Sequence, residues 1–286
     1  MTQTLETGLH ADVPHEAYHR RELGLASKTA LDLVRKAPAV YKAWIDGALD
    51  DDEEESEALV FGGMLHCAIL EPERFYRQYV VAPDFGNCTY RDNKAARDKW
   101  RAENKGRKEV TAKQYRMIQG MADAVRTHPI AGKLFTGGEA EVTLRWTDEA
   151  TGLRCKGRAD YYKVDAAREL VLASDLKSTL DATPEGFAKS CANFGYERQA
   201  AFYQQGFAAV GKPVDAFIFV AVQKDAPYLL RPIVLGPESI AAGAESIRED
   251  MATMAKCLKS GQWPGYDEDI AEVELPAWAF KRRRRA

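Results

Sequence analysis

Residues 153–179 read LRCKGRADYYKVDAARELVLASDLKST, and this stretch decides the fold. Its apolar residues predict two strands, 153–164 and 169–177, joined by a short turn after Val164. Immediately upstream, apolar and polar residues alternate from Glu139 to Trp146, and the segment DEATG at 148–152 supplies a turn. Residues 139–164 are therefore expected to form a hairpin that the strand 169–177 extends into a sheet.

The rest of the C-terminal half is predicted to extend this sheet and cover it with helices. Pro184 can start a helix that we expect to reach about Val210. Strands are expected at 216–222, apolar enough to be buried on both faces, and at 228–234, followed by a closing helix at 238–259. This order predicts an α/β (α+β) fold in which helices flank a mixed central β-sheet.

The first 135 residues have a helical period, because their apolar residues recur at spacings of three and four. We expect helices over 27–41, with a break or a new start at Pro38, and over 56–71, 91–104 and 111–127. The chain is accordingly divided into a mainly helical part that carries His66 (1–135), a core with the sheet (136–265) and a tail with a basic end (266–286).

The composition is that of an ordinary soluble globular protein: 286 residues, 45% hydrophobic and 29% charged. No apolar run approaches the roughly 20 residues that span a bilayer, and residues 1–10 are too polar for a signal peptide. We therefore expect a cytoplasmic protein without a membrane partner. The five cysteines form no CxxC pair and no zinc-ligand spacing, so we expect reduced thiols.

Charge is unevenly distributed along the chain. The net charge of −3 disfavours a protein that coats nucleic acid through bulk positive charge. Seven acidic residues fall within 50–57, and residues 281–285 read KRRRR. The basic end is either a solvated terminus or an arm that contacts phosphate, and the role of the acidic run is left open.

Asp160, Asp175 and Lys177 form a constellation that could carry chemistry. Asp175 and Lys177 are two apart on a predicted strand, so both side chains leave the same face, and Asp160 lies on the preceding strand. Two carboxylates are ligands that Mg²⁺ prefers, and a bound Mg²⁺ would activate a water for phosphodiester hydrolysis. The lysine would orient that water or neutralise developing charge. Each residue alone is commonplace, so their joint occurrence carries the prediction.

Gln199 and Tyr203 lie four apart and project from one face of the following helix. Taken alone, Tyr203 would pack with its hydroxyl at the surface, and Gln199 would be solvated. Beside an acidic D-x-K strand, the pair could instead contact a DNA backbone or orient the metal ligands.

Four segments together resemble a known family. Phe61-Gly-Gly-Met-Leu-His66, Gly157-Arg-Ala-Asp160, Asp175-Leu-Lys-Ser-Thr179 and Gly195-Tyr-Glu-Arg-Gln-Ala-Ala-Phe-Tyr203 look like motifs of the RecE-like phage and prophage exonucleases (exonuclease VIII), within the RecB-type PD-(D/E)xK nucleases. Residues 27–41 resemble the opening of that nuclease domain, and the resemblance spans roughly 10–235. It implies a restriction-endonuclease-like core and makes 136–265 the catalytic part.

Residue by residue, the resemblance implies a metal site with His66, Asp160 and Asp175, and it makes Lys177 the catalytic lysine. Without it, His66 would be a histidine on a helix face. Glu141 matches a catalytic acidic position on the first strand, although Glu139, two residues earlier on the same face, is an alternative. Residues assigned to DNA binding or to support of the metal ligands are Gln199 and Tyr203, as the Q-x-x-x-Y motif, with Ser178, Thr179 and Arg158.

The implied function is a Mg²⁺-dependent exodeoxyribonuclease, with Mn²⁺ as a substitute, that degrades linear double-stranded DNA from its ends. The resemblance implies 5′-to-3′ polarity, 3′ single strands handed to a RecT-like annealing protein, and a ring-shaped homo-oligomer. The chain lacks the cysteine grouping of iron-sulfur relatives and any GxxxxGK[ST] motif, so we expect no cluster and no use of ATP.

Three alternatives remain open at this point. The first is a nuclease that acts on single strands or flaps, which the sequence does not separate from the duplex enzyme. The second is an inactive DNA-binding or recombination-accessory protein of the same fold, which predicts a missing site residue. The third, a helical protein with an unrelated sheet, requires the four motifs to coincide by accident.

Overall fold

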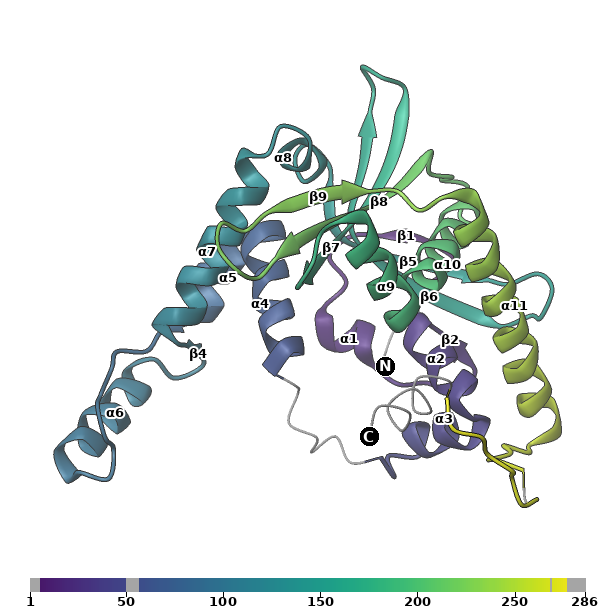
Figure 1. Cartoon of the computed structure of the whole chain (residues 1–286), viewed down its shortest axis with the longest axis horizontal. Helices are drawn as coiled ribbons and strands as arrows, with labels where there is room; N and C mark the ends of the chain where they lie inside the picture. Colours follow the sequence, from purple (N-terminus) through teal and green to yellow (C-terminus); the bar gives the residue numbers. More distant parts are fainter. Residues whose placement is uncertain (1–5, 50–56, 268, 277–286) are drawn as a thin grey trace, which may run out of the picture.

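The computed structural model describes residues 6–49, 57–267 and 269–276 (Figure 1). The acidic run, except for Glu57, and the basic end at 281–285 lie outside the described residues, so the expectations for them stay predictions. Within the described ranges, no helix is both long and apolar enough to cross a membrane.

A seven-stranded sheet forms the centre of the molecule, in the order β1-β5-β6-β7-β8-β9, where β1 is Gly8–His10, and β2 (Leu25–Ala26) also pairs with β6. The pairs β7–β8 and β2–β6 are parallel, and the remaining pairs are antiparallel. The expected mixed sheet flanked by helices is thus confirmed, and most of its pairs are antiparallel. Its main strands are β5 (Glu139–Thr147), β6 (Arg154–Asp165), β7 (Leu170–Thr179), β8 (Ala216–Gln223) and β9 (Leu230–Ile233).

Helices bury both faces of the sheet, and β8 shows how its sequence achieves this. Phe217, Phe219 and Ala221 pack into one core with side chains of α2 (Lys28–Lys36), α9 (Pro184–Phe194), α10 (Tyr196–Ala209) and α11 (Pro237–Ser260). Val220 and Val222 pack into a second core with α4 (Glu57–Leu70), α5 (Pro72–Gln78), α7 (Ala112–Thr127) and α8 (Ala131–Leu134). Successive strand residues point to opposite faces, so an uninterrupted apolar run fills both cores.

The single helix expected from Pro184 to about Val210 is wrong, because the structure has two helices. Gly195 separates α9 from α10 with a φ of 64°, in the left-handed region that glycine adopts at little cost. Its N–H donates to the Cys191 carbonyl and closes α9, while its own carbonyl accepts from Gln199 N–H in the first turn of α10. The chain therefore changes direction just before the residues of the Q-x-x-x-Y motif.

The N-terminal half is mainly helical, as expected, but it also contributes short strands. The break at Pro38 is confirmed, since α2 ends at Lys36 and α3 (Pro38–Ile45) begins at the proline. The short elements were not predicted, because two to five residues carry too little periodicity to be recognised. These are β1 (Gly8–His10), α1 (His15–His19), β2 (Leu25–Ala26) and the pair β3 (Tyr79–Val81) and β4 (Lys108–Val110).

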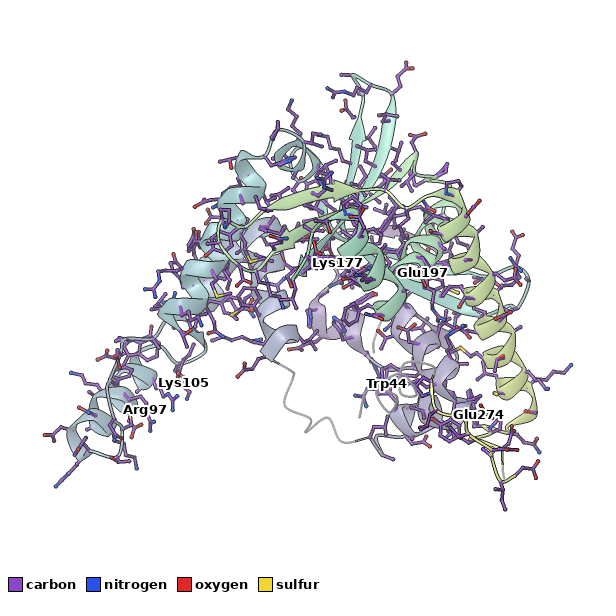
Figure 2. All side chains as sticks on the ribbon, in the orientation of Figure 1. Trp44, Arg97, Lys105, Lys177, Glu197 and Glu274 are labelled. Carbon is purple, nitrogen blue, oxygen red and sulfur yellow. The ribbon has the colours of Figure 1, made fainter. Side chains whose placement is uncertain are left out.

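One part of the N-terminal half extends away from the sheet. The helix α6 (Arg91–Glu103) and the strand β4 that follows it project from the body at the lower left of Figure 1. Figure 2 shows Arg97 and Lys105 on this arm, whereas Lys177 lies near the middle of the molecule.

Candidate active site

The site lies where β6 and β7 separate. Pairing between these strands runs from Asp165↔Leu170 to Tyr161↔Ser174, and the next residue on each strand is Asp160 and Asp175. Beyond this fork, Leu176 N–H donates to Asp160 Oδ2 at 2.7 Å, and the Leu176 carbonyl accepts from His66 Nε2 at 2.8 Å. Buried backbone groups need partners, so two site side chains take over the hydrogen bonds that a paired strand would make.

His66 reaches the fork from α4, whose buried face packs on the same core as Leu176. Because Nε2 donates to the Leu176 carbonyl, Nδ1 faces the acids, 3.3 Å from Asp160 Oδ2. Burial alone would lower the pKa of His66, but the Asp160 carboxylate outweighs it and raises that pKa to about 9. The imidazole is therefore drawn into the site by charge as well as by packing.

Glu141 stands opposite Asp160 on the neighbouring strand, between the pairs Ala140↔Tyr161 and Val142↔Ala159. Its φ of 53° lies in the left-handed region, which costs a residue with a side chain about 1–3 kcal/mol. Such strain persists only where the surroundings enforce it, and here Glu141 is half-buried toward His66 and Asp160. Glu139 is exposed, opposite Tyr162, so the geometry favours Glu141 as the acid of the site.

The carboxylates raise one another's affinity for protons. Burial, followed by repulsion from Asp160, raises the pKa of Glu141 to about 7 and that of Asp175 to about 6. Burial would raise the pKa of Asp160 as well, but His66 and Lys177 outweigh it and hold that pKa below its usual value. Three carboxylates thus lie close enough to repel one another even with His66, Lys177 and Arg158 beside them, and a bound cation would relieve this repulsion.

Asp175 and Lys177 make the contact that their spacing predicts. Asp175 is 1% exposed, with Oδ1 2.5 Å from Lys177 Nζ and Oδ2 accepting from Gln199 Nε2 at 2.5 Å. Lys177 Nζ also lies 4.8 Å from the centre of the Tyr196 ring. Burial would lower the pKa of Lys177, but Asp175 and Asp160 outweigh it and raise it, so the lysine stays charged. The sequence analysis had not singled out Tyr196, although it stands inside the GYERQAAFY motif.

Three of these side chains fit a metal ion. One ligand atom each from His66, Glu141 and Asp160 lies within 4.8 Å of the others. An imidazole whose second nitrogen donates to a backbone carbonyl, together with two carboxylates, is a common donor set for a divalent cation. Asp175 lies outside this group and contacts Lys177 and Gln199 instead. Its assignment as a metal ligand stays a prediction.

A family match agrees with this arrangement. The family model described as a PDDEXK-like domain of unknown function (DUF3799) matches residues 27–276. The chain belongs to this family. The PD-(D/E)xK fold expected from the sequence is thus confirmed, and the RecE-like character stays a resemblance.

A solved structure shares the architecture of this PDDEXK-like domain. A proposed exonuclease from Eubacterium rectale superposes with a TM-score of 0.60 at 16% identity, and the match covers 95% of this chain and 98% of that one. A phage-related exonuclease from Haemophilus somnus gives a TM-score of 0.33 at 13% identity over 62% of this chain and 92% of that one. No curated protein sequence matches the chain. At such low identity, the first likeness shows the fold alone.

Arg158 of the PDDEXK-like domain contacts a backbone carbonyl, a hydroxyl, an aromatic ring and a carboxylate of the protein. Its guanidinium donates to Val13 O at 2.7 Å and to Thr143 Oγ1 at 3.0 Å, and it lies over the Tyr18 ring, 4.2 Å from its centre. Nη1 is 3.8 Å from Glu141 Oε2. These contacts orient Glu141 and hold the N-terminal segment, and sequence reasoning had missed Tyr18 because it lies in a short helix without a motif.

Tyr203 lies inside the molecule and does not face solvent. It is 7% exposed, and its ring lies 3.1 Å from the position that a Cβ atom on Gly157 would occupy. Its hydroxyl forms hydrogen bonds with the Tyr18 side chain and the Arg158 backbone. Burial raises the pKa of Tyr203 well above its usual value. A side chain at residue 157 would therefore push Tyr203 away, which explains the glycine of the GRAD motif.

Two further residues of the predicted site follow Lys177 on β7. Ser178 is half-buried. Thr179 is buried, and its hydroxyl donates to the Asp181 carbonyl at 3.1 Å and accepts from Asp181 N–H at 3.2 Å, so it shapes the turn before α9. Their assignment to DNA binding, with that of Arg158, Gln199 and Tyr203, stays a prediction.

Proposed function

We propose that this protein is a nuclease that hydrolyses DNA phosphodiester bonds with a divalent metal ion. The observation that carries the proposal is the convergence of His66, Glu141 and Asp160 within 4.8 Å at the fork, next to a charged Lys177. A divalent cation held there would act as a Lewis acid on the phosphate and make water a better nucleophile at neutral pH.

The chain's own residues have distinct roles in this proposal. His66, Glu141 and Asp160 would hold the cation, and Asp175 would add an oxygen or orient Lys177. Lys177 keeps its charge through Asp175 and Asp160, so it can neutralise negative charge that develops on the phosphate. Gln199 restrains Asp175 from the side opposite Lys177, and Arg158 restrains Glu141.

The finer proposal is an exodeoxyribonuclease that uses Mg²⁺ and no ATP. It would degrade linear double-stranded DNA from 5′ ends, leave 3′ strands for a RecT-like annealing protein, and work as a ring-shaped oligomer. Its support is the resemblance of the four motifs to the RecE-like exonucleases. All the site residues that the resemblance requires are present in the described site. Their presence disfavours an inactive DNA-binding protein.

The test uses linear duplex DNA labelled separately at its 5′ and 3′ ends, without ATP, in Mg²⁺, Mn²⁺ or EDTA. We expect early release of the 5′ label in Mg²⁺ or Mn²⁺ and no release in EDTA. Closed circular DNA should stay intact. Faster cutting of single-stranded or flap substrates would replace the duplex assignment. Binding without hydrolysis in any divalent metal would favour the inactive DNA-binding protein.

A further inference from the structure

An exposed aromatic ring lies one ring away from the lysine of the site. Phe194, the last residue of α9, is 60% exposed. Its ring stacks on Tyr196, with 5.7 Å between centres and 28° between planes, and Tyr196 in turn lies under Lys177 Nζ. Single exposed apolar residues are ordinary on protein surfaces. Phe194 differs from them because it ends a continuous stack that begins at the site.

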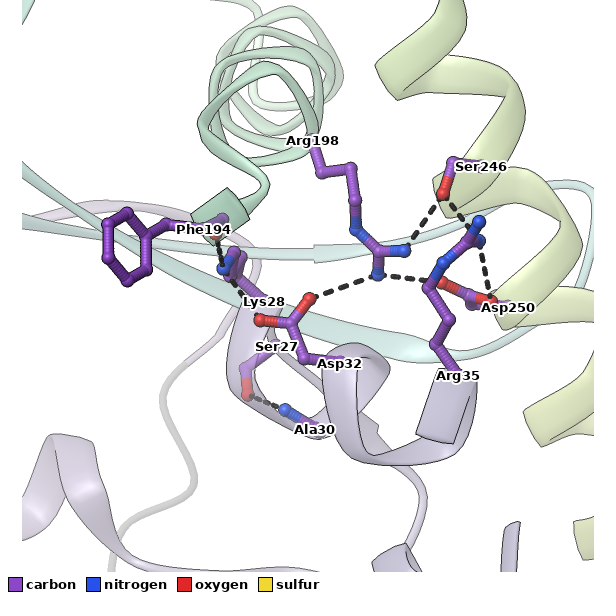
Figure 3. Close-up of polar contacts among 9 residues, drawn as sticks. All are labelled: Ser27, Lys28, Ala30, Asp32, Arg35, Phe194, Arg198, Ser246 and Asp250. Atoms are coloured by element: carbon purple, nitrogen blue, oxygen red, sulfur yellow. Dashed lines mark hydrogen bonds and ion pairs between the residues drawn. The ribbon is translucent and has the colours of Figure 1, made fainter. Parts of the chain in front are cut away.

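The helix break at Gly195 sets the orientation of the Phe194 ring. In an uninterrupted helix, residues 194 and 196 would point about 200° apart and could not stack. The left-handed φ of Gly195 ends α9 and turns both rings toward each other. Lys28 Nζ donates to the Phe194 carbonyl at 2.7 Å and fixes the last turn of α9. Figure 3 shows the Phe194 ring pointing away from the ion pairs of Arg198 and Asp250, beyond Lys28.

The inner part of the stack is well supported, so Phe194 rests on a rigid base. Tyr196 also stacks on Phe187 and on Phe219, whose rings are 1% and 0% exposed. A planar ligand on the open side of Phe194 would therefore extend an aromatic series anchored in the core. Two ammonium groups lie close by: that of Lys28, 22% exposed and paired with Asp32 at 2.6 Å, and that of Lys177, paired with Asp175 at 2.5 Å.

We propose that Phe194 forms a subsite on which a nucleobase of the bound DNA strand stacks, an inference that rests on the proposed function. An aromatic ring next to ammonium groups suits a ligand that combines flat bases with a phosphate chain. Stacking requires only the flat face that every base has, so the subsite accepts all four bases. Phe194 thereby positions the strand whose phosphate meets Lys177, without taking part in the chemical step.

The experiment compares wild type with Phe194→Ala, Phe194→Trp and, as a matched control, Ile130→Ala, whose side chain is 57% exposed beside α8. Substrates are DNA strands and duplexes of one sequence in which a single abasic nucleotide occupies each position of the cleaved end in turn. Phe194→Ala should raise KM on normal DNA about tenfold, with a smaller change in kcat. An abasic nucleotide at one position should abolish this difference, and Phe194→Trp should restore the wild-type KM.

Two outcomes overturn the inference while the proposed function stands. In the first, wild type cuts DNA and Phe194→Ala has the same KM on every substrate. In the second, the Phe194→Ala defect persists at full size at every abasic position, so no base is involved. A wild-type protein that neither binds nor cuts DNA refutes the proposed function and the subsite together. Thermal unfolding of Phe194→Ala should match wild type, because the ring is exposed.

Discussion

The molecule contains two clusters of charged side chains that differ in balance. At the fork, the three carboxylates of Glu141, Asp160 and Asp175 converge among three basic groups, those of His66, Lys177 and Arg158. Between α2, α10 and α11, three basic residues face two acids, and Figure 3 shows their contacts. These residues are Lys28, Arg35, Arg198, Asp32 and Asp250.

The second cluster binds helices to one another. Arg198 is 5% exposed, and its guanidinium lies 2.6 Å from Asp250 Oδ2 and 3.1 Å from Asp32 Oδ1 and donates to Ser246 Oγ at 2.8 Å. Basic side chains outnumber acidic ones in this cluster, so its charge does not favour a bound cation. At the fork the carboxylates lie close together, and burial, followed by repulsion from Asp160, raises the pKa of Glu141 to about 7. The fork is therefore suited to a metal ion, whereas the second cluster joins α10, which carries Gln199, to α2 and α11.

The largest effect is expected at the centre of the fork. Asp160→Asn removes the charge that faces His66 and keeps an oxygen that can accept from Leu176 N–H. Hydrolysis of linear DNA should fall about 10³-fold or more, and Mn²⁺ binding measured by calorimetry should be lost. Glu139→Gln, at an exposed position on β5, is the matched control and should retain activity. If Asp160→Asn hydrolyses DNA at the wild-type rate, the fork is not the catalytic site.

Lys177→Met should separate catalysis from metal binding. The change deletes the ammonium beside Asp175 and keeps most of the aliphatic chain that lies over Tyr196. We expect activity to fall about 10²–10³-fold while Mn²⁺ affinity stays the same or rises, since a positive charge near the site is lost. Weaker Mn²⁺ binding in calorimetric titration would contradict the assigned role of the lysine.

Arg198→Met tests the cluster between α2, α10 and α11 through stability. It leaves Asp250 buried without its nearest base, so the free energy of unfolding in urea should fall by about 3–5 kcal/mol. Arg35→Met, whose side chain is 52% exposed, serves as the control and should cost less than about 1 kcal/mol. Equal losses for the two variants would mean that burial does not distinguish these ion pairs.

Metal affinity should depend on pH in a direction set by the fork. In the metal-free protein, the pKa of Glu141 is about 7 and that of His66 about 9, and both groups must lose a proton to bind a cation. Mn²⁺ affinity should therefore rise between pH 6 and 9, and His66→Gln should flatten the upper part of the curve. A wild-type affinity that is constant over this interval would exclude both groups as ligands.

The same proton on His66 stabilises the metal-free fold. The folded pKa, about 9, exceeds the ordinary value of 6.5, so this stabilisation is complete below about pH 6.5. It should be lost as the pH rises toward 9, provided that no metal is bound. Thermal unfolding in EDTA across this interval should show the decline, and His66→Gln should reduce it.

Much of the fold was predictable because its signals are local. The alternation around 139–146 and the apolar runs of β7 and β8 predict strands, and Pro38 predicts a helix boundary. The two-residue spacing of Asp175 and Lys177 predicts that they share a face, and the structure has them in contact. The break at Gly195 was missed because a glycine within a helical pattern is often tolerated, and only packing decides whether it takes a left-handed φ.

By itself, the sequence determined the order of the five main strands, the shared face of Asp175 and Lys177, and the four motifs that resemble a nuclease family. Only the tertiary structure decided that Glu141 rather than Glu139 turns inward, that β6 and β7 part at Asp160, and that Phe194 stacks outside Tyr196. The physical reason is the separation along the chain of the residues that interact. Side-chain periodicity depends on neighbours in the chain, whereas the contact between His66 and Leu176 spans 110 residues and arises only when α4 packs against the sheet.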